Sequence, residues 1–134
     1  MKSLRITAAA AFLLAGLAGL IGCLYIPGNY RTLDGAPRPE SQIGSSNSGK
    51  PLQIMRATRQ DVERVLGHPS FEGDNGRNIV YAYEINTGLW ISLCYGAQPD
   101  NESRYLRLRF SPDGRLQDFK VFKDRLEAEA PLLT

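Results

Sequence analysis

The 134-residue sequence predicts an α+β fold, with a short N-terminal helix (or two) packed on a three- or four-stranded antiparallel meander. Three observations predict this class. A capped stripe of apolar residues comes before the strand-like segments. The segments that follow it alternate between apolar and polar side chains. Turns rich in Gly, Asn, Asp and Pro separate those segments, as in a chain of hairpins.

The helix has clear start and stop signals. The Thr58 hydroxyl can accept a hydrogen bond from a first-turn backbone N–H, and Asp61 occupies the third position of a capping box. Gly67 is a natural left-handed cap, and Pro69 prevents the helix from resuming. Between these signals, three apolar residues share one stripe at i, i+3 and i+4 spacing: Val62, Val65 and Leu66.

Two hairpins are expected after the helix. In the first, residues 78–85 form a strand, 86–88 turn with the sequence Asn-Thr-Gly, and 89–95 return. Residues 97–103, which include Pro99, are expected to form a loop.

The second hairpin has the more regular pattern. Residues 105–110 alternate, with Leu and Phe inward and Arg outward. Ser-Pro-Asp-Gly at 111–114 is a strong turn signal, and residues 116–122 pair back.

The N-terminus divides into zones typical of an export signal. Lys2 and Arg5 are followed by an uncharged apolar run over residues 6–20, short for a membrane span. Leu20-Ile21-Gly22-Cys23 then resembles the lipobox of bacterial lipoproteins, so residues 1–22 are expected to be a lipoprotein signal peptide. The alternative is an uncleaved signal anchor, since Leu24-Tyr25-Ile26 extends the apolar stretch.

The lipobox implies covalent lipid on Cys23. The thiol takes a diacylglyceryl group, the small Gly22 lets a peptidase approach, and the new amine of Cys23 takes an N-acyl chain. Two or three chains hold a protein on a membrane firmly. Because Leu24 and not Asp follows the cysteine, resemblance to the enteric sorting rule favours the outer membrane, facing the periplasm.

The rest of the chain is expected to have three parts. Residues 23–50, rich in Pro, Gly and Ser, are interpreted as the acylated cysteine and a flexible tether. Residues 51–123 form the α+β domain, and residues 124–134 form a C-terminal tail, either frayed or weakly helical.

Charge gives little support for nucleic-acid binding. Of the 16 Lys and Arg residues, Lys2 and Arg5 precede Cys23, so the mature part has 14 basic and 14 acidic side chains. A basic run on one segment is expected to be a solvated strand face: Arg104, Arg107 and Arg109.

Two motifs together resemble a known family. Residues 57–69, with Thr58, Val62, Leu66, Gly67 and Pro69, are similar to the helix motif of the SmpA/OmlA (BamE-like) small lipoproteins. Phe110-Ser111-Pro112-Asp113-Gly114-Arg115-Leu116 resembles the family's last turn. The resemblance covers about residues 52–122 and the lipobox. It implies an accessory subunit of the machinery that inserts β-barrels into the outer membrane. Arg56-Ala57 departs from the family's Gly-Met pair.

Catalysis and a bound metal or cofactor are not expected. His68 is the single histidine and is interpreted as a partner of the helix C-terminus. One His with one Cys falls short of a zinc site, and Cys94 in an apolar run is expected to be a buried small side chain. The protein is therefore predicted not to be an enzyme.

Two functional hypotheses remain open. The first is a membrane-anchored interaction module in envelope and outer-membrane protein assembly. Because Pro27-Gly28-Asn29-Tyr30 partly resembles a segment of the same family, Asn29 and Tyr30 are candidate partner contacts, and Trp90 is a third. The second is a lipoprotein that binds a glycan, peptide or lipid on an aromatic sheet face. The aromatic residues in question are expected to be core rather than a binding face: Tyr81, Tyr83, Trp90, Tyr95 and Tyr105.

Overall fold

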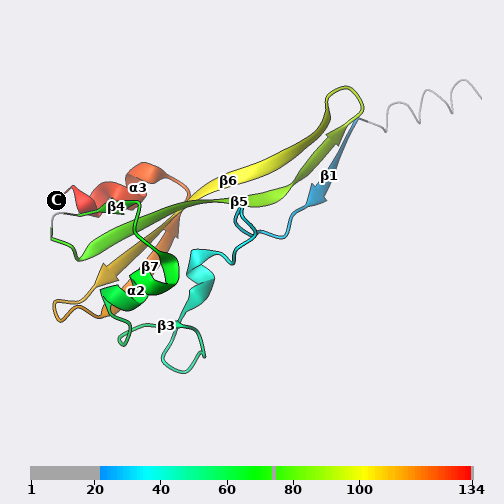
Figure 1. Ribbon diagram of the computed structural model, residues 1–134. Coiled ribbons are helices and arrows are strands. Elements are labelled where there is room, and N and C mark those ends of the chain that lie inside the picture. Colours follow the sequence, from blue (N-terminus) through cyan, green and yellow to red (C-terminus); the bar gives the residue numbers. More distant parts are fainter. Residues whose placement is uncertain (1–21, 74, 134) are drawn as a thin grey trace, which may run out of the picture. The chain divides into compact units, whose positions relative to one another are not determined.

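The computed structural model describes residues 22–73 and 75–133, and these are mostly β: 46% are in strands and 18% in helices. The expected α+β class, a short helix packed on a meander, is therefore wrong. The main sheet is curled, antiparallel and five-stranded, and the described residues contain two short α-helices, α2 (Arg59–Leu66) and α3 (Arg125–Glu129) (Figure 1). The prediction failed because two segments, one expected to be a turn and the other a loop, lie within strands.

The described chain forms two compact units. The first, called here the hairpin unit, contains residues 22–29 and 87–100; the second, the core unit, contains residues 30–86 and 101–133. Strands β5 (Asn78–Ser92) and β6 (Gly96–Phe110) contribute residues to both units.

In the core unit, β4 (Phe71–Glu72), β5, β6 and β7 (Leu116–Phe122) are neighbours in that order. The β6–β7 pairing runs from Tyr105 opposite Phe122 to Phe110 opposite Leu116, with an irregularity after Arg109. The turn at residues 111–114 forms as predicted, because the Ser111 N–H donates to the Arg115 carbonyl at 2.7 Å.

One face of this sheet carries the larger hydrophobic core. The inward residues predicted for residues 105–110 are confirmed: Leu106 and Leu108 are fully buried there. Val62 of α2 packs into the same core. So does a small parallel pair of strands, β2 (Ile43–Gly44) and β3 (Leu52–Gln53).

The opposite face carries a smaller core under the C-terminal helix. Val80, Phe122 and Ala128 form it, and a 3-10 helix, η2 (Ala130–Leu132), adds Leu132. Asp124 caps α3, since its side chain accepts from the Leu126 N–H. The segment expected to be a C-terminal tail at 124–134 therefore contains a capped helix whose Ala128 is fully buried.

In the hairpin unit, strand β1 (Cys23–Pro27) pairs antiparallel with the second half of β5. Cys23 lies opposite Ser92, Tyr25 opposite Trp90 and Pro27 opposite Gly88. The turn between β5 and β6 lies at residues 93–95.

The expected turn at residues 86–88 is wrong, because β5 continues through it. The Asn86 N–H donates to the Arg31 carbonyl and its own carbonyl accepts from the Tyr30 N–H, which keeps the backbone extended. The loop expected at residues 97–103 is also wrong, because it lies within β6. Pro99 is tolerated since no described strand other than β5 pairs with β6 in this unit, which leaves it an edge strand.

The segment interpreted as a flexible tether, residues 23–50, contains ordered elements. Besides β1, it holds a 3-10 helix, η1 (Pro39–Gln42), and β2, whose Ile43 is only 5% exposed. Composition misled here, because Gly, Pro and Ser also suit short connections between packed elements.

Candidate functional site

Cys23 begins the first described strand with an exposed, free thiol. Gly22 before it is also exposed, and no heavy atom lies within 4 Å of the place a Cβ would take. Leu20, Ile21 and the rest of the expected signal peptide lie outside the described residues. The two lipobox residues that are described therefore leave room around the cysteine.

The aromatic residues divide between core and surface. Tyr81 is buried and Tyr83 and Tyr105 are partly buried, as expected of core residues. The expectation is wrong for Trp90, which is 47% exposed, and for Tyr95, which is 82% exposed. Trp90 packs on Tyr25 with ring centroids 4.7 Å apart.

The candidate partner contacts Asn29, Tyr30 and Trp90 fall in different units. Asn29 and Trp90 belong to the hairpin unit and Tyr30 to the core unit. Tyr30 is 44% exposed and has a φ of 56°, a left-handed conformation uncommon for a tyrosine.

The helix motif forms with the predicted cap. The Thr58 hydroxyl accepts from the Asp61 N–H, and the Asp61 carboxylate accepts from the Thr58 N–H at 2.9 Å. The Thr58 hydroxyl also donates to this carboxylate oxygen at 2.9 Å. The bond from the Thr58 N–H first, and the bond from the Thr58 hydroxyl second, lower the pKa of Asp61.

The end of the helix also follows the prediction in part. Gly67 has a positive φ of 81°, but its ψ of −165° is extended rather than left-handed helical. Its carbonyl accepts from the Tyr81 hydroxyl at 2.8 Å. Val62 is fully buried and Leu66 partly so, whereas Val65 is 40% exposed and Pro69 half-buried.

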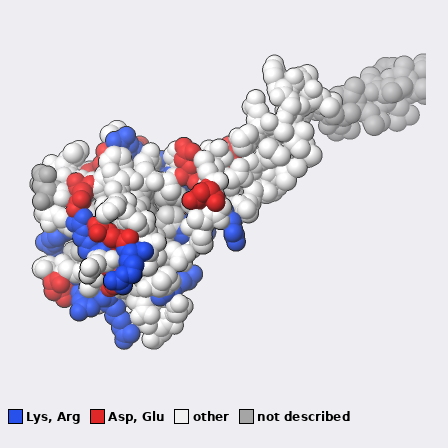
Figure 2. Space-filling view, in the orientation of Figure 1, with Lys and Arg blue, Asp and Glu red and all other residues white. Residues whose placement is uncertain are grey.

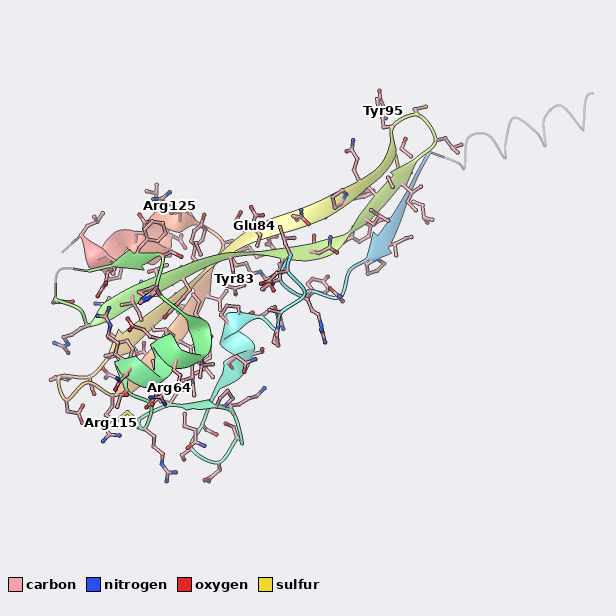
Figure 3. All side chains as sticks on the ribbon, in the orientation of Figure 1. Arg64, Tyr83, Glu84, Tyr95, Arg115 and Arg125 are labelled. Atoms are coloured by element: carbon pink, nitrogen blue, oxygen red, sulfur yellow. The ribbon has the colours of Figure 1, made fainter. Side chains whose placement is uncertain are left out.

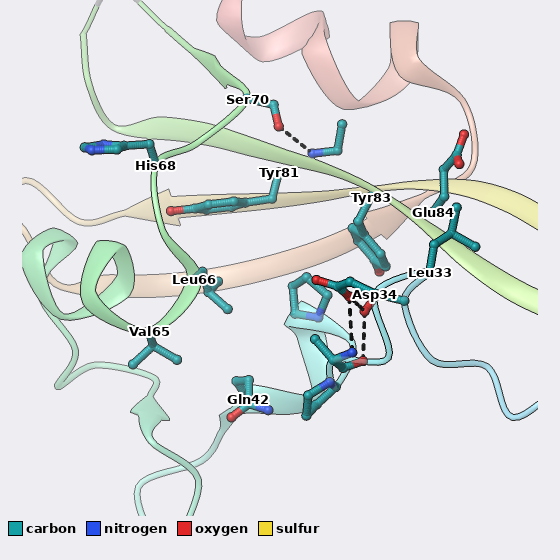
Figure 4. Close-up of a pocket in the computed structure, with 15 residues that line it drawn as sticks. Leu33, Asp34, Gln42, Val65, Leu66, His68, Ser70, Tyr81, Tyr83 and Glu84 are labelled. Atoms are coloured by element: carbon teal, nitrogen blue, oxygen red, sulfur yellow. Dashed lines mark hydrogen bonds between the residues drawn. The ribbon is translucent and has the colours of Figure 1, made fainter.

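A groove of about 890 Å³ lies in the core unit (Figure 4). One wall comes from the end of α2 and the segment after it, and the other from residues 32–42. The floor is β5 from Tyr81 to Glu84. A volume of this size suits a ligand or a short peptide.

The floor of the groove contains an open stretch of strand edge. β4 pairs with β5 only at Ile79 and Val80, and Thr32 bridges to Ile85. Between them, no described strand pairs with this side of β5. Ser70 accepts from the Ala82 N–H, and by alternation the Glu84 N–H faces the same side. Such an edge can accept an added strand.

The groove is lined by acidic rather than basic side chains. Asp34 accepts from the Thr32 hydroxyl and from the Ala36 N–H, and these bonds lower the pKa of Asp34. Glu84 is exposed on β5 (Figure 4), and none of the described residues that line the groove is a Lys or Arg. The groove therefore favours a positively charged occupant.

Tyr83 joins the two sides of this region. Its hydroxyl donates to Glu40 of η1 at 2.5 Å, and Arg38 lies 3.4 Å from the same carboxylate. Burial first, and then the bond to Glu40, raises the pKa of Tyr83. Tyr83 therefore stays a neutral donor that holds η1 against the sheet.

The remaining candidates give no catalytic constellation. His68 is exposed on the rim of the groove, and the described residues contain no cluster of three side chains that could hold a metal. Cys94 is exposed in the turn at residues 93–95, so the expectation of a buried thiol is wrong. Across residues 22–73 and 75–133, no helix has the length and apolar character needed to cross a membrane.

Sequence reasoning missed the groove because its walls are far apart in the chain. The turn at residues 32–36 had a readable signal, since Asp34-Gly35 is a frequent turn pair. Nothing in the sequence indicated that this turn and η1 would lie beside β5, because that placement depends on the Tyr83–Glu40 contact.

None of the protein-family models, curated proteins or solved structures compared with the chain matches it. The resemblance to the SmpA/OmlA family therefore rests on the helix motif, the last turn and the lipobox alone.

Proposed function

We propose that this chain is a membrane-anchored lipoprotein that acts as a non-catalytic interaction module in cell-envelope and outer-membrane protein assembly. The observation that carries this proposal is Cys23, which ends the lipobox and begins β1 with an exposed thiol. Lipid chains on this residue would hold the folded protein at a bilayer surface. The outer membrane, facing the periplasm, is the proposed location, and no cofactor is proposed beyond the covalent lipid.

The groove is the proposed contact site in the core unit. An extended segment of an envelope protein would add to the open edge of β5, donating to and accepting from its backbone. Asp34 and Glu84 favour a segment that carries Lys or Arg. The family resemblance points to subunits of the barrel-assembly machinery as the first partners to test.

Affinity purification of the tagged full chain from gently solubilised membranes tests this function. Barrel-assembly or other envelope-assembly subunits should be enriched with the wild type and reduced with Cys23→Ala. Failure to enrich any such subunit with the wild type would mean that the interaction-module proposal is abandoned.

Two variants at one position test the groove. Glu84→Arg reverses a charge on its floor, and Glu84→Pro removes a backbone donor expected to face the groove. Glu127→Arg is the matched control, because Glu127 is also exposed but lies on α3. Both Glu84 variants should lose the partner while the control keeps it. Equal retention in all three would remove the groove from the proposal.

The second hypothesis, a lipoprotein that binds a ligand on an aromatic face, has one observation in its favour. Trp90 is half-exposed and packs against Tyr25, with the two rings tilted by 46°, rather than being buried in a core. Titration of glycans and peptides against the fluorescence of Trp90 tests it, and an unchanged spectrum with all of them would count against it.

A further inference from the structure

We propose that the tip of the hairpin unit, the turn at residues 93–95 with the adjoining parts of β1 and β5, docks into the interfacial layer of a lipid bilayer. The inference rests on the proposed lipid anchor at Cys23 and adds a second membrane contact to it. The occupant of this apolar surface is thus the membrane itself, and not a protein.

The first argument is the absence of charge. Among residues 22–29 and 87–100, Asp100 is the only Asp, Glu, Lys or Arg, and it lies at the end of the hairpin unit's share of β6. The visible face of the tip in Figure 2 carries neither basic nor acidic atoms. A surface without charges gives up little hydration when it enters the interfacial layer.

The second argument is the exposure of large apolar side chains. Leu93 is 77% exposed and Tyr95 is 82% exposed, and Figure 3 shows Tyr95 directed away from the turn. Both faces of the β1–β5 pair are apolar. Tyr25 and Trp90 share one face, and the other face holds two apolar pairs of the register: Leu24 with Ile91 and Ile26 with Leu89. A contiguous patch of this kind marks an interaction site.

The third argument identifies the membrane as the occupant. Cys23 lies opposite Ser92, the last residue of β5 before the turn. Acyl chains on Cys23 would therefore enter the bilayer beside Leu93, and the turn could not stay far from the lipid surface. The anchor and the apolar tip form one continuous surface.

The position of Trp90 along β5 suits the depth of the interfacial layer. It precedes Leu93 by three residues, roughly 10 Å along a strand. Apolar groups of interfacial segments enter the boundary layer by about 5–10 Å. Trp90 would then lie at the headgroup level, where Trp and Tyr are preferred.

The strand edge limits how deep the tip can go. β1 is at the edge of its sheet among the described strands, so half of its backbone N–H and C=O groups have no ladder partner. Such groups are costly to bury in hydrocarbon. The structure therefore favours a shallow position and not a deep one.

Trp90 is the single tryptophan of the chain and reports directly on this docking. The full chain, isolated from membranes, is reconstituted into phosphatidylethanolamine–phosphatidylglycerol vesicles that carry nitroxide labels near the headgroup or near the chain end. Intact mass shows separately whether Cys23 is acylated. We expect blue-shifted Trp90 emission and quenching by the shallow label, with little quenching by the deep one.

The variant Leu93→Asp with Tyr95→Asp should lose the shallow quenching, whereas the control Leu126→Asp, which alters an exposed leucine of α3, should keep it. An acylated wild type whose Trp90 is not quenched would overturn the tip docking and leave the lipoprotein proposal standing. Quenching of Trp90 in a protein whose Cys23 is not acylated would leave the tip docking standing and overturn the lipoprotein proposal. Equal quenching in both variants would also overturn the docking.

Discussion

The ring of Tyr25 lies against the backbone of Gly88, so close that a Cβ at position 88 would be 2.5 Å from the ring and its hydroxyl oxygen. The Tyr25 hydroxyl donates to the neighbouring Thr87 carbonyl at 2.6 Å. Glycine within a strand commonly marks such an approach. Gly88, which the sequence analysis expected in a turn, therefore leaves the space that the Tyr25 side chain of β1 occupies.

Gly88→Ala is expected to displace the Tyr25 ring from Thr87 and Trp90 and to destabilise the β1–β5 pairing by about 1 kcal/mol, the size of one hydrogen bond or aromatic contact. Amide exchange of residues 24–27 measures the loss, and Trp90 fluorescence follows the ring. In a Tyr25→Ala background the same substitution should have little effect. An equal effect in both backgrounds would contradict the proposed contact.

Local signals in the sequence predicted α2 well. The capping box at Thr58 and Asp61 depends on neighbours within a few residues and forms as expected. The helix also ends before Gly67, whose φ is positive as expected although its ψ is extended. The alternation that buries Leu106 and Leu108 is equally local, since each strand face repeats every second residue.

The fold class could not be predicted in the same way. Gly88 and Pro99 read as breakers, yet each suits its strand because of a partner or an edge that only the tertiary structure supplies. The groove likewise depends on Glu40 meeting Tyr83, a contact across 43 residues. Composition over residues 23–50 gave no indication that Ile43 is buried.

Ile43→Ala tests the order within that segment. Because Ile43 lies in the larger core, the substitution is expected to lower the free energy of unfolding by about 2–5 kcal/mol. Leu33→Ala, in the same segment at a residue 54% exposed, should change it by about 0.5 kcal/mol or less. Denaturant titration measures both. Two equally small effects would mean that the segment is a tether after all.

The raised pKa of Tyr81 predicts that the protein loses stability at alkaline pH. Burial raises the pKa of Tyr81 from 10.0 to about 12, so the folded chain keeps a proton that the unfolded chain has lost. The contribution of Tyr81 to the free energy of unfolding is complete below pH 10 and falls as the pH rises toward 12. Tyr81→Phe should flatten this decline and, by removing the bond to the Gly67 carbonyl, cost about 1 kcal/mol at neutral pH.

The control for that titration is Tyr95→Phe, which removes a hydroxyl from a tyrosine that is 82% exposed. Tyr83 also has a raised pKa, so part of the alkaline decline should persist in Tyr81→Phe. Denaturant midpoints measured from pH 7 to pH 12 give the comparison. A profile in Tyr81→Phe that is identical to the wild type would contradict the assignment.

Thr58→Ala should cost about 1 kcal/mol, because it removes the acceptor that caps α2. It should also raise the pKa of Asp61 toward 3.8, since the Thr58 hydroxyl bond that helps to lower it is gone. Thr58→Ser keeps the hydroxyl and serves as the control. Carboxyl titration by NMR follows Asp61 directly, and an unchanged pKa in Thr58→Ala would contradict the capping geometry.

Cys94 offers a last test of the hairpin tip, because it lies between Leu93 and Tyr95 with an exposed thiol. In protein that is kept in a low concentration of detergent without lipid, Cys94 should react with a water-soluble maleimide. Its rate should be about that of a cysteine introduced by Ser46→Cys, in an exposed loop of the core unit. On vesicles, Cys94 should become protected while the position-46 thiol stays reactive, since docking covers only the tip. Equal protection of both thiols would indicate general surface adsorption, and no protection of either would leave the tip in water.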